Sequence, residues 1–361
     1  MNTENKYCLE YVWIDRNGHY RSKTRVVNYE VNDRGHAPEW NFDGSSTDQI
    51  EEYMDAYGER IDHSDNTEIK LVPVAIFKDP FRNRTRDRIV LCECYNVDDT
   101  PLACNYRYFA VQQAFRFKKN TKPWFGMEQE YFIIDPNTKM PLGYHATKKQ
   151  GNFYCGVGTE NAYGRHLAEY HMKICLRAGV RICGINAEVA PGQWEFQIGT
   201  CEGVSIGDHM HIARYLLYRS AELFHVMVSL HPKPLSGNKW NGSGCHTNFS
   251  TVEMREGDEQ HDGYHYIEEA IRNLNHAHNI MIKYYGKDNE QRLTGKCETS
   301  SLTEFTWGVG TRNTSIRIPN NTFNDMCGYF EDRRPSSNCD PYLVAHKLYF
   351  YAILNDVGCS D

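Results

Sequence analysis

The sequence predicts an α+β protein with two domains, a small β-rich domain followed by a larger domain that mixes helices and strands. The chain has 361 residues, which is long enough for two domains and a sizeable core. Apolar residues make up 40% and charged residues 24%, as in ordinary globular proteins. Strand patterns fill residues 6–98, whereas helical patterns begin after 105. The turn-rich segment "NVDDTPLACN" at 96–105 therefore marks a domain boundary, giving domains at 6–98 and 105–361.

The first domain is predicted from four β-branched and aromatic runs: "CLEYVWID", "SKTRVV", "KLVPVAIF" and "RIVLCECY". Turn signals such as "RNG" and "KDPFRN" separate them. The segment around 47–70 is acidic and polar, and we interpret it as a long loop.

The second domain is predicted to contain several helices. Apolar residues recur at helical spacing in "NYRYFAVQQAFRFKKN". An amphipathic helix follows in "NAYGRHLAEYHMKICLRAGV", with Gly179 as its C-cap. Two further helices are expected over "SIGDHMHIARYLLYRSAELFHVMVSL" and "YHYIEEAIRNLNHAHNIMIKYYG".

Charge and cysteine content exclude some functions. The net charge of −7 is spread along the chain, so no positive face concentrates for nucleic acid. The chain lacks an apolar run long enough to span a bilayer and an N-terminal signal pattern, so we expect a cytoplasmic protein without a membrane partner. The thirteen cysteines have no regular spacing, which favours free thiols in a reducing compartment. The "HMH" and "HAH" pairs lie in helical segments and make poor chelates.

Two glutamates interrupt an apolar strand in "PWFGMEQEYFII" at 123–134. Glu128 and Glu130 are two residues apart, so both side chains point to one face of a strand. Neighbouring carboxylates repel one another and lose hydration when they are covered. A second acidic pair lies in "INAEVAPGQWEFQIG": if Pro191-Gly192 closes a tight hairpin, Glu188 lies opposite Glu195. Since L-Pro-Gly favours type II turns, a wider loop is the alternative.

Divalent cations explain this cost, because Mg²⁺ and Mn²⁺ bind carboxylate oxygens and cancel their repulsion. In "GYFEDRRPSSNCDP", Glu331 and Arg333 share a strand face and Arg334 lies opposite; a Gly-rich strand upstream carries His246. Arginines also cluster, at Arg292, Arg312, Arg317, Arg333 and Arg334. Because arginine binds phosphates and carboxylates bidentately, these residues indicate a metal- and phosphate-handling enzyme. Each feature alone is more often a solvated face or a core histidine.

Seven blocks of the chain resemble one known family. They are "WNFDGSST" (40–47), "FGMEQEY" (125–131), "NAEVAPGQWEFQIG" (186–199), "NGSGCHTNFS" (241–250), "RLTG" (292–295), "SIRIP" (315–319) and "GYFEDRRPSSNCDP" (328–341). In this order they resemble glutamine synthetase of the eukaryotic type, over roughly residues 8–355. The resemblance implies an N-terminal β-grasp domain and a catalytic domain built on a curved antiparallel sheet with helices. It also implies ATP-dependent ligation of ammonia to glutamate through γ-glutamyl phosphate.

The resemblance assigns roles to individual residues. Two or three Mg²⁺ or Mn²⁺ ions are implied, one held by Glu130, Glu188 and Glu195 and another by Glu128, His246 and Glu331. The implied glutamate-binding residues are Glu130, Trp240, Asn241, Gly242, Arg292, Arg312 and Arg333. The implied ATP-binding residues are Trp124, Glu128, Thr200, Asn248, Phe249, Ser250, Arg255, Arg312, Arg317 and Tyr329. The implied catalytic residues are Asp43, which takes a proton from ammonium, Glu298, which shields the intermediate, and Arg312. A homo-decamer of two pentameric rings is implied, in which Asp43 reaches the site from the neighbouring subunit.

Some positions depart from the family pattern. An acidic insertion lies around 48–65, Lys239 is an extra residue, Cys297 replaces a usual histidine, and "TRNTS" replaces "NRSAS" around Arg312. Two alternatives to an active glutamine synthetase are a catalytically inactive relative and a ligase that joins glutamate to a larger amine. All six implied metal ligands are present, which favours an active enzyme, and the Asp43 and Glu298 matches favour ammonia as the amine.

Overall fold

The computed structural model describes residues 6–50, 53–54, 60–61, 66–82, 84–115, 120–145, 150–235 and 240–354. The chain divides into two compact units, residues 1–109 with 177–179, and residues 110–176 with 180–361. Most of the predicted acidic insertion, and Lys239, lie outside the described residues. In the described part of that insertion, β4 (Tyr53–Met54) and β5 (Arg60–Ile61) form a short antiparallel pair instead of the predicted loop.

The first unit contains a five-stranded sheet with the order β2-β1-β7-β6-β3. Its strands are β1 (Tyr7–Ile14), β2 (Tyr20–Val27), β3 (Trp40–Asp43), β6 (Glu68–Lys78) and β7 (Arg88–Tyr95). The pairs are antiparallel except β1–β7, which is parallel. The four predicted strand runs are therefore confirmed as β1, β2, β6 and β7.

Alternation along these strands produces the core of the first unit. Leu9, Tyr11 and Trp13 point to one face of β1 and join a buried cluster, because side chains two apart on a strand share a face. The Trp13 ring stacks on Phe42 of β3 at 4.6 Å between ring centroids. Phe42 precedes Asp43, so this packing fixes the end of β3 that carries the acid.

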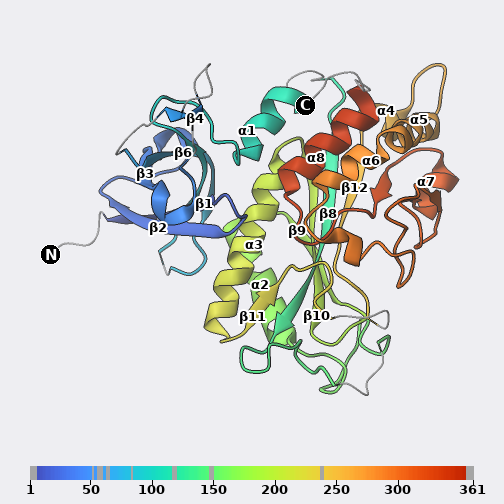
Figure 1. Cartoon of the computed structure of the whole chain (residues 1–361), viewed down its shortest axis with the longest axis horizontal. Coiled ribbons are helices and arrows are strands. Elements are labelled where there is room, and N and C mark those ends of the chain that lie inside the picture. Colours follow the sequence, from blue (N-terminus) through green and yellow to red (C-terminus); the bar gives the residue numbers. More distant parts are fainter. Residues whose placement is uncertain are drawn as a thin grey trace. The chain divides into compact units, whose positions relative to one another are not determined.

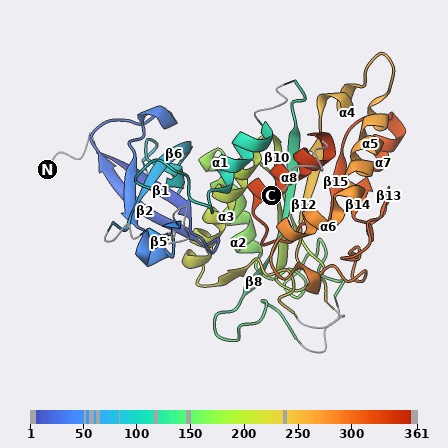
Figure 2. The ribbon, with the colours of Figure 1, turned by 45° about the horizontal axis from the view of Figure 1, so that its top comes forward.

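The second unit is built on an eight-stranded sheet with the order β13-β14-β15-β12-β8-β10-β9, in which β11 also pairs with β8 (Figures 1 and 2). Its strands are β8 (Trp124–Ile134), β9 (Ile182–Ala187), β10 (Gln193–Glu202), β11 (Met227–Ser229), β12 (Cys245–Ser250), β13 (Trp307–Val309), β14 (Ile316–Ile318) and β15 (Phe330–Asp332). The mixed architecture of helices on a curved sheet is confirmed. The expectation of a purely antiparallel sheet is wrong at one edge, since β13 and β14 run parallel.

The segment α1 (Tyr106–Ala110) spans the boundary between the two units. The helices of the second unit are α2 (Arg165–Ala178), α3 (Ser205–Leu223), α4 (Val252–Glu256), α5 (Gly263–His276), α6 (His278–Met281), α7 (Asn320–Asp325) and α8 (Pro341–Tyr349). Figure 1 shows α3 and α8 side by side, and Tyr342 of α8 donates a hydrogen bond to Asp208 of α3 at 2.6 Å. The predicted cap of α2 is confirmed, because Gly179 has a φ of +85°.

Two predicted helices are shorter than expected. The chain leaves α3 after Leu223, His225 adopts a left-handed φ of 53°, and the following residues form β11 against β8. The segment predicted as one helix over 264–286 is broken near Ala277 into α5 and α6. In the first case tertiary pairing with the sheet prevails over local helical spacing.

The β9–β10 hairpin is wider than the tight turn predicted from Pro191-Gly192. The backbone N–H of Glu188 donates to Gln193 O at 2.9 Å, and Gln193 N–H donates to Ala190 O at 3.2 Å. Gly192 has a φ of +67°, as the third residue of a type II turn requires. In consequence Glu195 pairs with Asn186 rather than Glu188, and the predicted Glu188–Glu195 register is wrong.

Candidate active site

Five acids and a histidine meet on four neighbouring strands and the turn after β9. Glu128 and Glu130 lie on β8, between β12 and β10 in the sheet. Glu130 is directly opposite Glu195 of β10, and Glu128 is directly opposite His246 of β12. Glu331 of β15 pairs with Asn248 of β12. The six residues form two groups of three. The first group is Glu130, Glu188 and Glu195, and the second is Glu128, His246 and Glu331. Within each group, one potential ligand atom from each residue lies within 4.8 Å of those from the other two.

The first group, Glu130, Glu188 and Glu195, is a carboxylate cluster that the protein covers. Glu130 and Glu195 are less than a tenth exposed. Burial, followed by repulsion from Glu130, raises the pKa of Glu188 to about 8. Burial and repulsion from three neighbouring glutamates raise the pKa of Glu195 to about 9. Burial also raises the pKa of Glu130, against the opposing effect of Arg292. Three oxygen donors held this close, whose charges would repel one another if all three acids were ionised without a cation, fit a hard divalent cation.

Amide groups orient these three acids. Glu130 Oε2 accepts hydrogen bonds from Gly244 N–H at 2.7 Å and Gln193 Nε2 at 3.4 Å. Glu195 Oε1 accepts from Gln197 Nε2 at 2.7 Å. Glu188 Oε1 accepts from Asn186 Nδ2 at 2.9 Å. These hydrogen bonds orient the carboxylates without neutralising their charge.

The second group, Glu128, His246 and Glu331, presents one nitrogen and two carboxylates. His246 Nδ1 is 3.4 Å from Glu331 Oε1 and 3.8 Å from Glu128 Oε2. Its other nitrogen, Nε2, lies 3.1 Å from Arg292 Nη2. Burial, followed by repulsion from Arg333, lowers the pKa of His246 well below its usual value, so the ring is neutral. A neutral imidazole beside carboxylates is the form that binds metal ions.

Arginines surround the second group. Arg333 Nη1 lies 2.6 Å from Glu331 Oε1, which confirms that the two residues share a face, and Arg317 Nη1 lies 3.3 Å from Glu331 Oε2. Arg292 is buried, and burial lowers its pKa to about 10. By contrast, Arg334 points to the opposite face as predicted, where it pairs with Asp332 at 2.7 Å.

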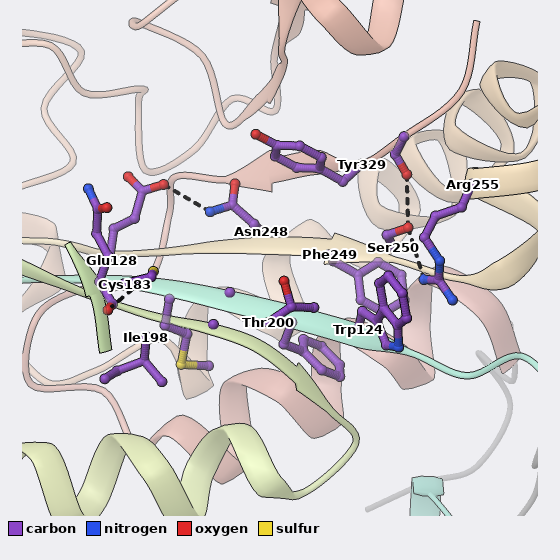
Figure 3. Close-up of a pocket in the computed structure, with 16 residues that line it drawn as sticks. Trp124, Glu128, Cys183, Ile198, Thr200, Asn248, Phe249, Ser250, Arg255 and Tyr329 are labelled. Atoms are coloured by element: carbon purple, nitrogen blue, oxygen red, sulfur yellow. Dashed lines mark hydrogen bonds between the residues drawn. The ribbon is translucent and has the colours of Figure 1, made fainter. Parts of the chain in front are cut away.

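A pocket of about 460 Å³ opens beside the second group (Figure 3). Eight of the residues assigned to ATP line it: Trp124, Glu128, Thr200, Asn248, Phe249, Ser250, Arg255 and Tyr329. At one end the Arg255 guanidinium lies 3.8 Å from the centre of the Trp124 ring and donates to Ser250 Oγ at 3.1 Å. At the other end, Asn248 Nδ2 donates to Glu128 Oε1 at 2.8 Å. The pocket therefore extends from an aromatic–cationic end to the acids.

Among the remaining predicted residues, Arg312 and Glu298 lie on loops, and Asp43 is the last residue of β3. Exposed Arg312 is 3.8 Å from Glu298, whose backbone has a left-handed φ of 61°. Asp43, in the first unit, is exposed, and hydrogen bonds from the side chain and backbone of Ser45, together with other hydroxyls, lower its pKa. The Trp240 ring packs in an apolar cluster with Phe132 and Leu235.

Sequence reasoning missed residues that contact the assigned ones. Gln197 and Cys183 line the pocket, and Gln193 contacts Glu130. Strand alternation offers a signal for the glutamines, since residues 193, 195 and 197 share one face of β10. The contact of Gln150 with Asn241, at 2.8 Å between side chains, joins segments ninety-one positions apart and has no local signal.

Comparison with known proteins identifies the family. Residues 107–353 match the model described as glutamine synthetase, catalytic domain. The chain is 49% identical over 342 residues to glutamine synthetase of Candida glabrata, covering 94% of this chain and 87% of that protein. It is 47% identical over 356 residues to glutamine synthetase of Gallus gallus, and 46% identical over 356 residues to that of Homo sapiens, covering 96% of this chain and 90% of each relative. The chain is therefore a member of the glutamine synthetase family, the glutamate–ammonia ligases.

Proposed function

We propose that the protein ligates ammonia to glutamate with ATP, through γ-glutamyl phosphate, to give glutamine. The observation that carries this proposal is the pair of three-residue ligand groups on adjacent strands, one of them beside a pocket lined by an arginine and aromatic side chains. Acids for cations and a pocket for a nucleotide are what phosphoryl transfer to a carboxylate requires.

Two or three Mg²⁺ or Mn²⁺ ions are the proposed cofactors. Glu130, Glu188 and Glu195 would hold one ion, and Glu128, His246 and Glu331 would hold another. The raised pKa values of Glu188 and Glu195 support this fit, because an ion would remove the repulsion that raises them. When bound, the cations supply positive charge to the phosphates and to the carboxylate of glutamate.

In the first step the γ-carboxylate of glutamate attacks the terminal phosphorus of ATP, and the bond from that phosphorus to the β-phosphate oxygen breaks, which gives γ-glutamyl phosphate and ADP. Arg312 and Arg317 would neutralise the charge that develops on the phosphoryl group. Arg292 and Arg333 would bind the carboxylates of glutamate, with Asn241 and Gly242 at its amino-acid end. The ATP itself would occupy the pocket, with its base near Trp124 and Tyr329 and its phosphates toward Glu128.

In the second step ammonia attacks the carbonyl carbon of the acyl phosphate, and inorganic phosphate leaves to give glutamine. Ammonium must first lose a proton, and Asp43 would accept it. Hydrogen bonds that lower the pKa of Asp43 keep it ionised at neutral pH, as this role requires. Glu298 would cover the intermediate. Its backbone adopts a left-handed conformation, which is uncommon for a residue with a side chain, and this supports a functional role for the loop at Glu298.

The assembly and domain organisation are also proposals. We propose domains at 6–98, with a β-grasp fold, and 105–361, and a homo-decamer of two pentameric rings whose active sites lie between subunits. A cytoplasmic location is proposed because no disulfide links cysteines in the described ranges. Among the helices of the described residues, none is long and apolar enough to cross a bilayer.

The test is γ-glutamyl hydroxamate formation from glutamate, ATP and hydroxylamine with Mn²⁺ or Mg²⁺. We expect hydroxamate to form and ammonia to stimulate phosphate release far more than larger amines do. Absence of hydroxamate with both metals would indicate an inactive relative. Stronger stimulation by a polyamine would indicate a ligase for larger amines.

A further inference from the structure

We infer that Gln193 is a positioning residue that couples the three-carboxylate group to the loop 240–244. This inference rests on the proposed function, which places glutamate at this loop. Gln193 is the first residue of β10 and is 2% exposed. A buried amide must satisfy its donors and acceptor within the protein, so its partners identify what it holds in place.

The partners of Gln193 lie on three separate segments. Its Nε2 donates to Gly242 O at 3.0 Å and lies 3.4 Å from Glu130 Oε2. Its Oε1 accepts from the backbone N–H of Ala190 at 3.3 Å, in the turn that follows Glu188. One side chain therefore contacts the loop 240–244, an acid of the first group and the turn beside another acid.

The loop and Glu130 are joined by further hydrogen bonds. Gly244 N–H donates to Glu130 Oε2 at 2.7 Å, and Glu130 N–H donates to Gly244 O at 3.0 Å. None of these bonds uses Glu130 Oε1. Gly242 has no room for a side chain, because a Cβ there would lie 2.3 Å from Pro232 O. The loop is thus tightly packed, and a shift of Gly242 would displace the side chains of Gln193 and Glu130.

Two other glutamines contact one side of this connection each. Gln150 Oε1 accepts from Asn241 N–H at 2.7 Å, and its Nε2 donates to Asn241 Oδ1 at 2.8 Å, so it holds the loop. Gln197 holds Glu195 at 2.7 Å. Of these three glutamines, Gln193 is the one that contacts both the loop and an acid of the first group. The trio therefore provides matched controls for a coupling role.

The physical consequence is reciprocal binding. If glutamate fixes the loop in the conformation that orients Gln193, Glu130 is held in place for a cation at lower cost in free energy. Coupling between two binding sites must act equally in both directions. Glutamate is therefore expected to raise the affinity for Mn²⁺, and Mn²⁺ to raise the affinity for glutamate.

The experiment titrates Mn²⁺ into the cation-free full-length protein, with free Mn²⁺ read by electron paramagnetic resonance, with and without glutamate. In the wild type, glutamate should tighten Mn²⁺ binding at least about fivefold, the lower end of typical coupling between sites. The substitution Gln193→Met should weaken Mn²⁺ binding by about 10-fold or more, as loss of an outer partner of a ligand does, and should reduce the coupling. Gln150→Met should weaken glutamate binding and leave Mn²⁺ binding in the absence of glutamate unchanged. Gln197→Met should weaken Mn²⁺ binding but keep the increase in Mn²⁺ affinity that glutamate causes.

Two results would overturn the inference: no coupling in the wild type, or wild-type coupling in Gln193→Met. The first result is measured on the wild type, so it tests the inference even if the variant does not fold. If the wild type neither binds Mn²⁺ nor forms hydroxamate, the proposed function itself has failed. If it does both while Gln193→Met couples normally, the inference alone is wrong.

Discussion

Glu130 of β8 lies directly opposite Glu195 of β10, and both carboxyl groups are buried. Like charges opposite each other destabilise a sheet, and burial adds a cost of lost hydration. The sheet therefore contains a place that is unfavourable for folding and favourable for a cation.

Glu195→Gln should change stability and metal binding in opposite directions. The amide keeps the shape of the side chain and removes a group that repels Glu130, so the melting temperature of the cation-free protein should rise or stay unchanged. Mn²⁺ affinity should fall by at least about a hundredfold, since loss of even an outer partner costs about 10–100-fold. Thermal unfolding and Mn²⁺ titration on the same preparation check both signs. Unaltered Mn²⁺ affinity would remove Glu195 from the proposed ligands.

Mn²⁺ binding should release protons near neutral pH. In the cation-free protein the pKa values of Glu188 and Glu195 are about 8 and 9, so both acids are largely protonated at pH 7 and must ionise to bind a cation. Affinity should therefore rise as the pH increases from about 6 to 9. Calorimetry in buffers of different ionisation enthalpy counts the protons. Glu195→Gln should release fewer, and equal heats in all buffers would contradict the assignment.

The same shifts predict the pH dependence of stability. The folded pKa values lie above that of an unfolded glutamate, so the folded state holds extra protons between about pH 4.5 and 9. Their contribution to stability is present at low pH and is lost as the pH rises through 8 and 9. The melting temperature of the cation-free wild type should fall more from pH 6 to 9 than that of Glu195→Gln. A larger fall in the variant would reverse the expected sign.

Arg255→Ala should weaken ATP binding selectively. The guanidinium stacks on Trp124 and contacts Ser250 at the pocket, away from the residues assigned to glutamate. The KM for ATP should rise about tenfold, consistent with loss of roughly 1–2 kcal/mol from a cation–π contact, while the KM for glutamate stays nearly unchanged. Arg219→Ala removes another contact between an arginine and an aromatic ring, 6.0 Å from the centre of the Tyr215 ring on α3, and serves as the control. Equal effects of the two variants would argue against a nucleotide role for Arg255.

Asp43→Asn should damage the ammonia step more than nucleotide binding. Loss of a general base typically costs about 10²–10⁴-fold, so ammonia-dependent turnover should fall in that range while ADP affinity is retained. Asp33→Asn is a matched control, because Asp33 caps a 3₁₀ turn through Gly35 N–H as Asp43 does through Ser45 N–H. A collapse of ADP affinity in Asp43→Asn would show that its role is a different one.

Strand alternation accounts for what the sequence could predict. It placed Glu128 with Glu130, and Glu331 with Arg333, because period-two geometry needs no tertiary information. The predicted hairpin register was wrong at Glu188, because a four-residue turn replaces the expected two-residue turn and shifts the strand pairing by two residues. The glutamate that does lie opposite Glu195 is Glu130, on a distant strand, and such pairings depend on the order of strands in the sheet.

Helix ends and loop contacts were less predictable for the same reason. The apolar residues after Leu223 fit a helical pattern and a strand pattern equally well. They form β11 because they can pair with β8. Gln150 and Gln193 contact the loop 240–244 through side chains from distant segments. Grouping of the six candidate ligands into two sets of three was implied by family resemblance, and the sheet brings the same sets together.

The most direct test of the account is an anomalous difference map from crystals soaked in Mn²⁺. We predict one peak between Glu130, Glu188 and Glu195 and a second among Glu128, His246 and Glu331. Crystals with no anomalous peak at either group would contradict the claim that divalent cations resolve the repulsion between these acids.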